Sequence, residues 1–200
     1  MKKDRSNDFE YWLGFDPLWE EYEIIEHNVN RPKGDGTFCF QVGNDSISDG
    51  DGFPASYDDS YVKIDENDFQ YVIDLFHKAG EEICALAEKH GRPIERPIVA
   101  GDYVYDGGSF IHIQNLSYDR EKLWIEEFYY DGYDLDVYID LDVVGKTDEY
   151  DLNEIESEGL FITEALYLQA INIAKSAILE ITDHLRRLHT QKLSEKSYDQ

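Results

Sequence analysis

Apolar positions recur along the chain with a helical period in two long segments. In residues 65–90 and 163–189 they return at spacings of three and four, which places them on one face of a helix. Asp65 and Thr163 stand at the starts of these segments, where a side-chain oxygen can accept hydrogen bonds from free backbone amides. Gly91 ends the first segment and is followed two residues later by a proline. We therefore expect two long amphipathic helices.

A shorter helix is predicted near the N-terminus, from Asp16 to His27. Asp16 is a typical N-cap residue, and Pro17 fits the first helical position, where its missing N–H costs nothing. The residues before it, about 1–15, are interpreted as a polar arm, and those of about 190–200 as a polar tail. The apolar residues that would share one face of this helix are Leu18, Tyr22 and Ile25.

Alternation of apolar and polar residues predicts strands in much of the remaining chain. Short strands are expected at Thr37–Val42 and Tyr61–Ile64, and an antiparallel meander over residues 98–142, in which Asp131-Gly132 signals a two-residue hairpin turn. The predicted fold class is α+β: an antiparallel β-meander with two long helices packed on one face, in a single domain of residues 1–200. The meander strands are Ile98–Tyr105, Ser109–Leu116, Leu123–Tyr130 and Tyr133–Asp142, followed by an irregular segment, 143–160.

Negative charge is the most distinctive property of the composition. The chain carries 44 acidic and 18 basic residues, a formal net charge of −26, while 42% of its residues are hydrophobic. That much hydrophobic material predicts a folded protein and not a disordered acidic chain. The charge opposes binding to nucleic acid and to anionic membrane surfaces, and it attracts basic partners.

The acidic residues are concentrated in one part of the chain. Eleven acidic residues and one basic residue lie between Asp131 and Glu158, whereas residues 163–200 hold five of each kind. A one-sided field of this sort favours the recruitment of a basic partner more than it favours uniform solubility.

The segment Tyr133–Asp142 is the most informative part of this acidic region. Strand side chains alternate between faces, so the four aspartates within this strand would share one face, about 6.7 Å apart where they are adjacent. Adjacent carboxylates then repel by about 0.6 kcal/mol even in water, and aspartate is a poor strand former. We interpret this face as a partner-binding surface; the alternative is a solvated face that supplies solubility.

The predicted hairpin adds two residues of the preceding strand to this face. With Asp131-Gly132 as the turn, Tyr129 would lie opposite Asp134, and Glu127 opposite Asp136. Exposed tyrosine beside polar residues is characteristic of protein-binding surfaces. The candidate partner-binding residues are Asp134, Asp136, Tyr138, Asp140, Asp142, Glu127 and Tyr129.

No catalytic motif is found in the sequence. There is no G-x-S-x-G elbow and no phosphate-binding loop with its lysine, and neither Cys39 nor Cys84 has a catalytic context. Both cysteines lie in apolar patterns and are interpreted as buried, reduced thiols. Of the six histidines, His112 is the most notable, although a satisfied, half-buried histidine is its ordinary explanation. The residues that would share its face of the strand pair are Tyr103, Tyr105 and Phe110.

The sequence also predicts no metal site and no cofactor. The loop of residues 45–59 is rich in aspartate and glycine, as calcium loops are. Started at Asp45, however, it has Ser56 where a calcium loop needs glutamate; started at Asp49, it has Pro54 in place of the glycine. No histidine pair has the neighbours of a zinc site.

These observations favour a non-enzymatic binding protein that occupies a basic surface of a partner protein. Its most concrete form is an immunity-type inhibitor that blocks the cationic channel of a nuclease toxin or another DNA-binding protein. Two alternatives stay open: a nucleic-acid mimic whose aspartates imitate phosphates, and a hydrolase whose clustered carboxylates hold Mg²⁺ or Mn²⁺. The N-terminus leads into polar residues and no stretch reaches transmembrane length, so we expect a cytoplasmic protein that binds no membrane.

Overall fold

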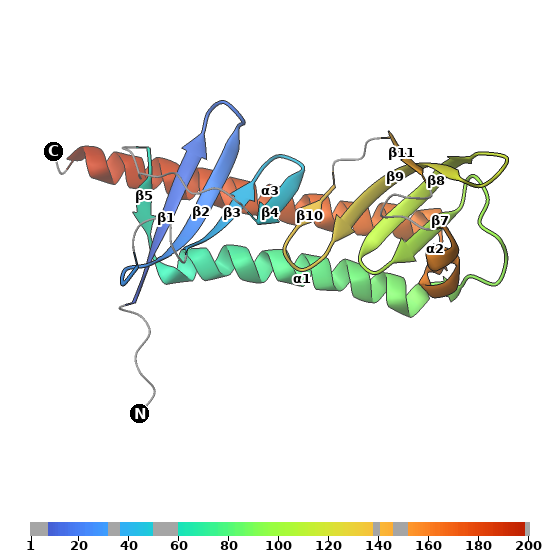
Figure 1. Ribbon diagram of the computed structural model, residues 1–200. Coiled ribbons are helices and arrows are strands. Elements are labelled where there is room, and N and C mark those ends of the chain that lie inside the picture. Colours follow the sequence, from blue (N-terminus) through green and yellow to red (C-terminus); the bar gives the residue numbers. More distant parts are fainter. Residues whose placement is uncertain (1–7, 32–36, 50–59, 138–140, 146–151, 199–200) are drawn as a thin grey trace. The chain divides into compact units, whose positions relative to one another are not determined.

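The computed structural model describes residues 8–31, 37–49, 60–137, 141–145 and 152–198. In this part the chain forms antiparallel strands, two long helices and one short helix, which confirms the predicted α+β class (Figure 1). The helices are α1 (Glu66–His90), α2 (Leu152–Glu158) and α3 (Glu164–Tyr198). The strands are β1 (Phe9–Asp16), β2 (Glu21–Asn28), β3 (Thr37–Val42), β4 (Ser46–Asp49), β5 (Val62–Ile64), β6 (Arg92–Pro93), β7 (Tyr103–Asp106), β8 (Ser109–Leu116), β9 (Lys122–Tyr130), β10 (Leu135–Asp136), β11 (Leu141–Gly145) and β12 (Leu160–Ile162).

The chain divides into two compact units. Unit 2 comprises Lys78–Ser176, and unit 1 consists of the residues before it and after it. Both boundaries fall inside long helices, so each unit contains its own group of strands and a part of both α1 and α3. The two units share these helices. Whether residues 1–200 fold as a single domain stays a prediction. None of the helices in the described part of the chain combines the length and the apolar character that crossing a membrane requires.

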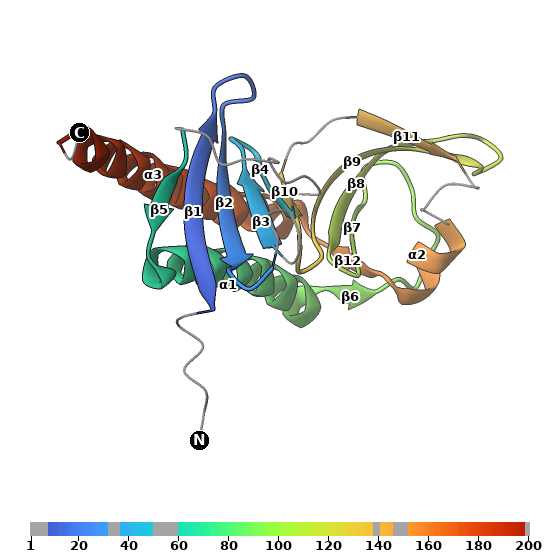
Figure 2. The same ribbon diagram turned by 60° about the vertical axis from the view of Figure 1, so that its left-hand side comes forward.

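Unit 1 is a five-stranded antiparallel sheet, in the order β5-β1-β2-β3-β4, that packs on the two long helices (Figure 2). Phe40 of β3 packs against Phe76 of α1 with ring centroids 5.2 Å apart, and Tyr22 of β2 lies edge-on to His189 of α3 at 6.1 Å. On the same face, Ile24 of β2 is fully buried opposite Leu13 of β1. One face of this sheet is therefore covered by both long helices, as predicted.

Unit 2 contains strands in the order β10-β9-β8-β7-β12-β6, with β11 also paired to β9. One face again packs on both long helices. Phe110 of β8 and Phe128 of β9 stack at 4.5 Å, and Tyr167 of α3 meets Phe128 edge-on at 5.3 Å. Tyr105 of β7 forms a side-chain hydrogen bond with Cys84 of α1. These contacts join the strands of the meander to the apolar faces of α1 and α3.

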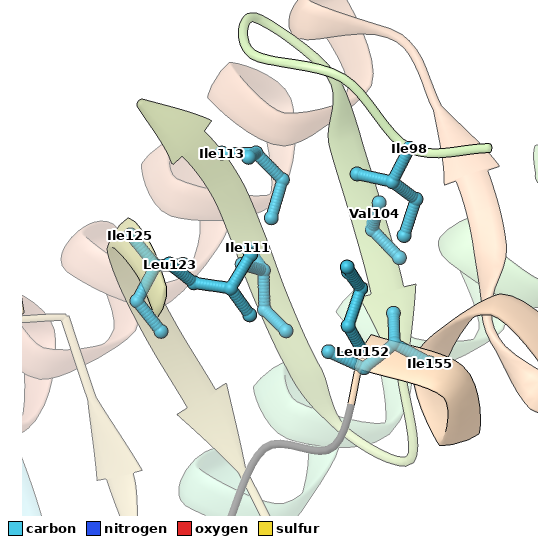
Figure 3. Close-up of a cluster of buried hydrophobic side chains, with 8 residues drawn as sticks. All are labelled: Ile98, Val104, Ile111, Ile113, Leu123, Ile125, Leu152 and Ile155. Atoms are coloured by element: carbon cyan, nitrogen blue, oxygen red, sulfur yellow. The ribbon is translucent and has the colours of Figure 1, made fainter. Parts of the chain in front are cut away.

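The opposite face of the unit 2 sheet is covered as well, by the short helix α2. Its Leu152 and Ile155 point toward the strands (Figure 3). Glu156 fixes the helix, because its carboxylate pairs with Arg120 and accepts a hydrogen bond from the Ile98 N–H at 2.8 Å. The interpretation of residues 143–160 as irregular is thus wrong for α2 and β11. The buried cluster consists of Ile98, Val104, Ile111, Ile113, Leu123, Ile125, Leu152 and Ile155.

The predicted helix from Asp16 to His27 is wrong, since this segment contains the end of β1, a turn and most of β2. The predicted capping chemistry is present, but it closes a turn: Asp16 Oδ1 accepts hydrogen bonds from the N–H groups of Leu18, at 2.7 Å, and Trp19, at 3.4 Å. β2 pairs with β1 on one side and β3 on the other. Two rows of cross-strand hydrogen bonds therefore outweigh a local helix signal.

Other boundaries also differ from those predicted. The predicted N-terminal arm includes residues that form β1, and the predicted tail is helical as far as Tyr198, where α3 ends. The loop expected after Val42 contains β4. Residues 1–7, 199–200 and most of the 45–59 loop lie outside the described residues.

Candidate functional site

The predicted binding face is built on the connection between β9 and β10. This turn spans four residues instead of two, because the Asp131 carboxylate accepts hydrogen bonds from the N–H groups of Tyr133 and Asp134, each at 2.8 Å. The Asp131 N–H in turn donates to the Asp134 carbonyl oxygen at 3.2 Å. The turn is thus closed by one backbone hydrogen bond between Asp131 and Asp134 together with the two bonds that the aspartate side chain accepts.

The longer turn shifts the strand register by two residues. Asp136 lies opposite Tyr129, so the predicted pairs Tyr129–Asp134 and Glu127–Asp136 are wrong. A shift of two residues preserves the alternation of faces, whereas a shift of one would reverse it. Asp136 therefore stays on the face of Tyr129, as predicted.

Carboxylates gather around Tyr129 in the described part of this face. Tyr129 is half-buried, and its pKa is raised first by burial and then by the charges of Asp134, Asp136, Asp131 and Glu127. We call these five residues the Tyr129 cluster. The phenol stays protonated at neutral pH and can donate a hydrogen bond. The negative charge of the four acidic residues would attract a cation brought by a partner.

Three predicted site residues cannot be assigned to this cluster. Tyr138 and Asp140 lie outside the described residues, and Asp142 belongs to β11, where its backbone pairs with Ile125 of β9. The register of β11 on β9 is offset by two residues from that of β10. The predicted continuous strand Tyr133–Asp142 is therefore wrong. The weak strand preference of aspartate and repulsion between like charges favour such an interruption.

Asp131 is a member of the Tyr129 cluster that was predicted only as part of the turn. The sequence contained a signal for this role, since an aspartate in a turn often accepts hydrogen bonds from the backbone N–H groups two and three residues later. Because that carboxylate is held by two hydrogen bonds, its position relative to Tyr129 is fixed by the turn.

A second polar group crosses three strands of unit 2 on the face of the long helices. His112 of β8 lies opposite Tyr103 of β7 and opposite Glu126 of β9. The imidazole stacks on the Tyr103 ring at 4.1 Å, and its Nδ1 lies 3.1 Å from Glu126 Oε2 and 2.9 Å from Gln114 Nε2. The predicted shared face of His112 and Tyr103 is confirmed. The stacked ring and the two polar neighbours of Nδ1 fix the orientation of the imidazole.

Tyr103 also lines a cavity of about 810 Å³ in unit 2. Arg96 at its wall is held by Asp102 through two hydrogen bonds of 2.6 and 2.7 Å and lies 4.4 Å from the centre of the Phe161 ring. The Arg96 guanidinium beside Asp102 holds the pKa of that carboxyl below its usual range. The cavity has the size of small-molecule pockets. Its two arginines and two acidic residues cancel in formal charge, so the lining selects neither anions nor cations.

The comparisons with known proteins add no relative. No family model, curated protein or solved structure matches this chain. Within the described residues, no group of three or more histidine, cysteine, aspartate or glutamate side chains is arranged to hold a metal ion.

Proposed function

We propose that this protein is a non-enzymatic binding protein that presents the Tyr129 cluster to a basic surface of a partner protein. The observation that carries the proposal is that β9, β10 and the turn between them place four acidic residues around half-buried Tyr129, with Asp136 directly opposite it, and that their charges act on its pKa. A lysine or arginine of a partner would be attracted to this group of negative charges. Tyr129 adds a hydrogen-bond donor and an aromatic surface, both common at protein interfaces.

The most specific form of the proposal is an immunity-type inhibitor of a nuclease or another nucleic-acid-binding protein. Such a partner needs a cationic channel for its polyanionic substrate. A protein with a net charge of −26 is steered into that channel from a distance, and the cluster then occupies part of it. A cytoplasmic location and the absence of direct binding to nucleic acid belong to the same proposal.

The test begins with affinity capture from lysate of the source cells at low and at high salt. We expect a basic protein that is retained at low salt and released at high salt. Kinetics are then compared between the wild type and a variant with Glu127→Gln, Asp131→Asn, Asp134→Asn and Asp136→Asn. Asparagine at position 131 can still accept the two turn hydrogen bonds. The association rate should fall about tenfold at low salt and lose much of its salt dependence.

A control variant removes the same number of charges from exposed sites of the same unit. Its substitutions are Glu82→Gln, Glu88→Gln, Glu95→Gln and Glu121→Gln. Equal slowing in both variants would show that only the net charge matters, which contradicts a role for the Tyr129 cluster. Binding of several unrelated DNA-binding proteins would indicate a nucleic-acid mimic, whereas binding of one cognate partner supports the inhibitor.

A further inference from the structure

The hairpin between β1 and β2 ends in two exposed apolar side chains. Leu18 is 78% exposed and its neighbour Trp19 is 69% exposed. Single exposed apolar residues are common, but a leucine and a tryptophan side by side at the tip of a hairpin form a contiguous apolar surface. Leu18 was predicted to share one face of a helix with Tyr22 and Ile25, so this exposed surface was not predicted.

The hairpin holds the tip in a fixed conformation. Every residue of β1 pairs with a residue of β2, and the last pair, Asp16 with Glu21, directly encloses the turn. Inside the turn, Asp16 Oδ1 accepts the hydrogen bonds from the Leu18 and Trp19 amides. Glu20 completes the turn with a φ of +57°, in the left-handed region. A side chain presented by an ordered turn loses little conformational freedom when it binds.

Acidic residues flank the apolar tip on both strands and in the turn. The stretch from Asp16 to Glu23 contains four acidic residues and no basic residue. Burial raises the pKa of Glu21, and the charges of Asp16 and Glu23 raise it further. The tip therefore combines an apolar centre with a negative rim, which is the usual layout of an interface with a desolvated core and a polar edge.

We infer that the Leu18–Trp19 tip is an anchor that inserts into an apolar pocket bordered by lysine or arginine residues on a basic partner protein. Tryptophan is among the residues most often found at the energetic centre of interfaces, and the flanking carboxylates match the charge of such a border. A second copy of this chain would bring another net charge of −26, and an anionic lipid surface would repel the same carboxylates. The inference depends on the proposed basic partner and assigns it a contact in unit 1, separate from the Tyr129 cluster.

The inference is tested by photo-crosslinking in source cells. A benzophenone amino acid is placed at Leu18, and in a control protein at Tyr118, which is fully exposed in unit 2. We expect position 18 to crosslink to one basic protein and position 118 to give no such product. The captured protein is then purified for kinetics with Trp19→Ala and with Leu168→Ala, a control on α3 with an exposed side chain.

Trp19→Ala should raise the dissociation rate at least tenfold and leave the salt dependence of association unchanged, because the lost contact is apolar. Leu168→Ala should behave as wild type. No crosslink from position 18, or a Trp19→Ala dissociation rate within twofold of wild type, overturns the inference. If a basic partner depends on the Tyr129 cluster but not on Trp19, the proposed function stands alone. If no basic protein is captured at all, both the inference about the Leu18–Trp19 tip and the proposed function are refuted.

Discussion

A glycine in the turn between β7 and β8 limits how the strand that carries Tyr129 can be placed. Gly108 has a φ of +114°, and a Cβ atom at this position would lie 2.2 Å from the carbonyl oxygen of Tyr130. That oxygen belongs to the backbone, and the Tyr130 N–H donates to the Gly108 carbonyl oxygen at 3.2 Å. Alanine at position 108 would therefore push the end of β9 away from β8, next to the Tyr129 cluster.

The preceding residue provides a matched control for the Gly108→Ala substitution. Gly107 has a φ of +55°, and a Cβ there would meet no atom within 4 Å. An alanine in the left-handed region destabilises the folded state by about 1–2 kcal/mol. Its lower conformational entropy in the unfolded chain offsets about 0.4–1 kcal/mol of this loss. Gly107→Ala should thus lower the free energy of unfolding by about 1 kcal/mol. Gly108→Ala combines about 1–3 kcal/mol of backbone strain with a similar amount from steric overlap, so the free energy of unfolding should fall by about 2–6 kcal/mol.

Urea unfolding followed by circular dichroism measures both free energies of unfolding. The decisive quantity is the difference between the two variants, since both lose a glycine from the same turn. Gly108→Ala should also slow association with a captured partner, because the Tyr129 cluster moves with β9. A free energy of unfolding within 1 kcal/mol of that of Gly107→Ala would refute the close approach of Gly108 to Tyr130.

Three further predictions follow from burial and charge. Ile155→Ala should lower the free energy of unfolding by about 2–5 kcal/mol in urea because Ile155 is buried under the sheet, while Leu179→Ala at an exposed site should cost less than about 1 kcal/mol. Lowering the pH from 7 to about 4.5 should raise the free energy of unfolding. Burial raises the pKa of Glu26, so at these pH values the folded state binds more protons than the unfolded state does. A free energy of unfolding that falls over this pH range would contradict this reasoning. Thiol labelling should modify Cys39 and Cys84 slowly in the native protein and rapidly in denaturant, because Cys39 is buried and burial raises the pKa of Cys84; rapid native labelling would disprove it.

The long helices could be predicted because their signals are local. Asp65 caps α1 as expected, since its Oδ1 accepts hydrogen bonds from the N–H groups of Asn67 and Asp68 at 2.9 and 3.0 Å. Thr163 caps α3 in the same way, through a bond from the Leu166 N–H at 3.2 Å. Such contacts join residues two or three apart, so a single sequence contains the information. The strand Ser109–Leu116 was also predicted with its observed bounds.

Strand pairing was harder to predict, because it depends on residues far apart in the chain. Tyr22 and Ile25 fit one face of a helix, but in β2 they lie on opposite faces of the strand and both are buried. Only pairing with β1 and β3 decides between the two structures. The helix α2 is too short for a period to be seen, and it is stabilised by contacts such as that of Glu156 with Arg120. In the candidate site, one side-chain oxygen of Asp131 changed the turn and hence the register. The face could be predicted from alternation, but the partners of each residue could not.

The placement of the acidic residues bears on whether the acidic surface serves solubility or binding. Solubility needs net charge, but it does not need carboxylates placed where their own pKa values or those of their neighbours are raised. Glu21 and Tyr129 both lie in such places, one beside the hairpin tip and the other at the end of β9. A partner's cation beside Glu21 would lower the pKa of this carboxyl and favour its charged form, so binding would recover stability that burying the carboxyl costs. Local arrangements that oppose folding without an evident structural gain are expected at functional sites. The placement of these two groups, more than the size of the net charge, is therefore the physical reason to prefer binding over solubility.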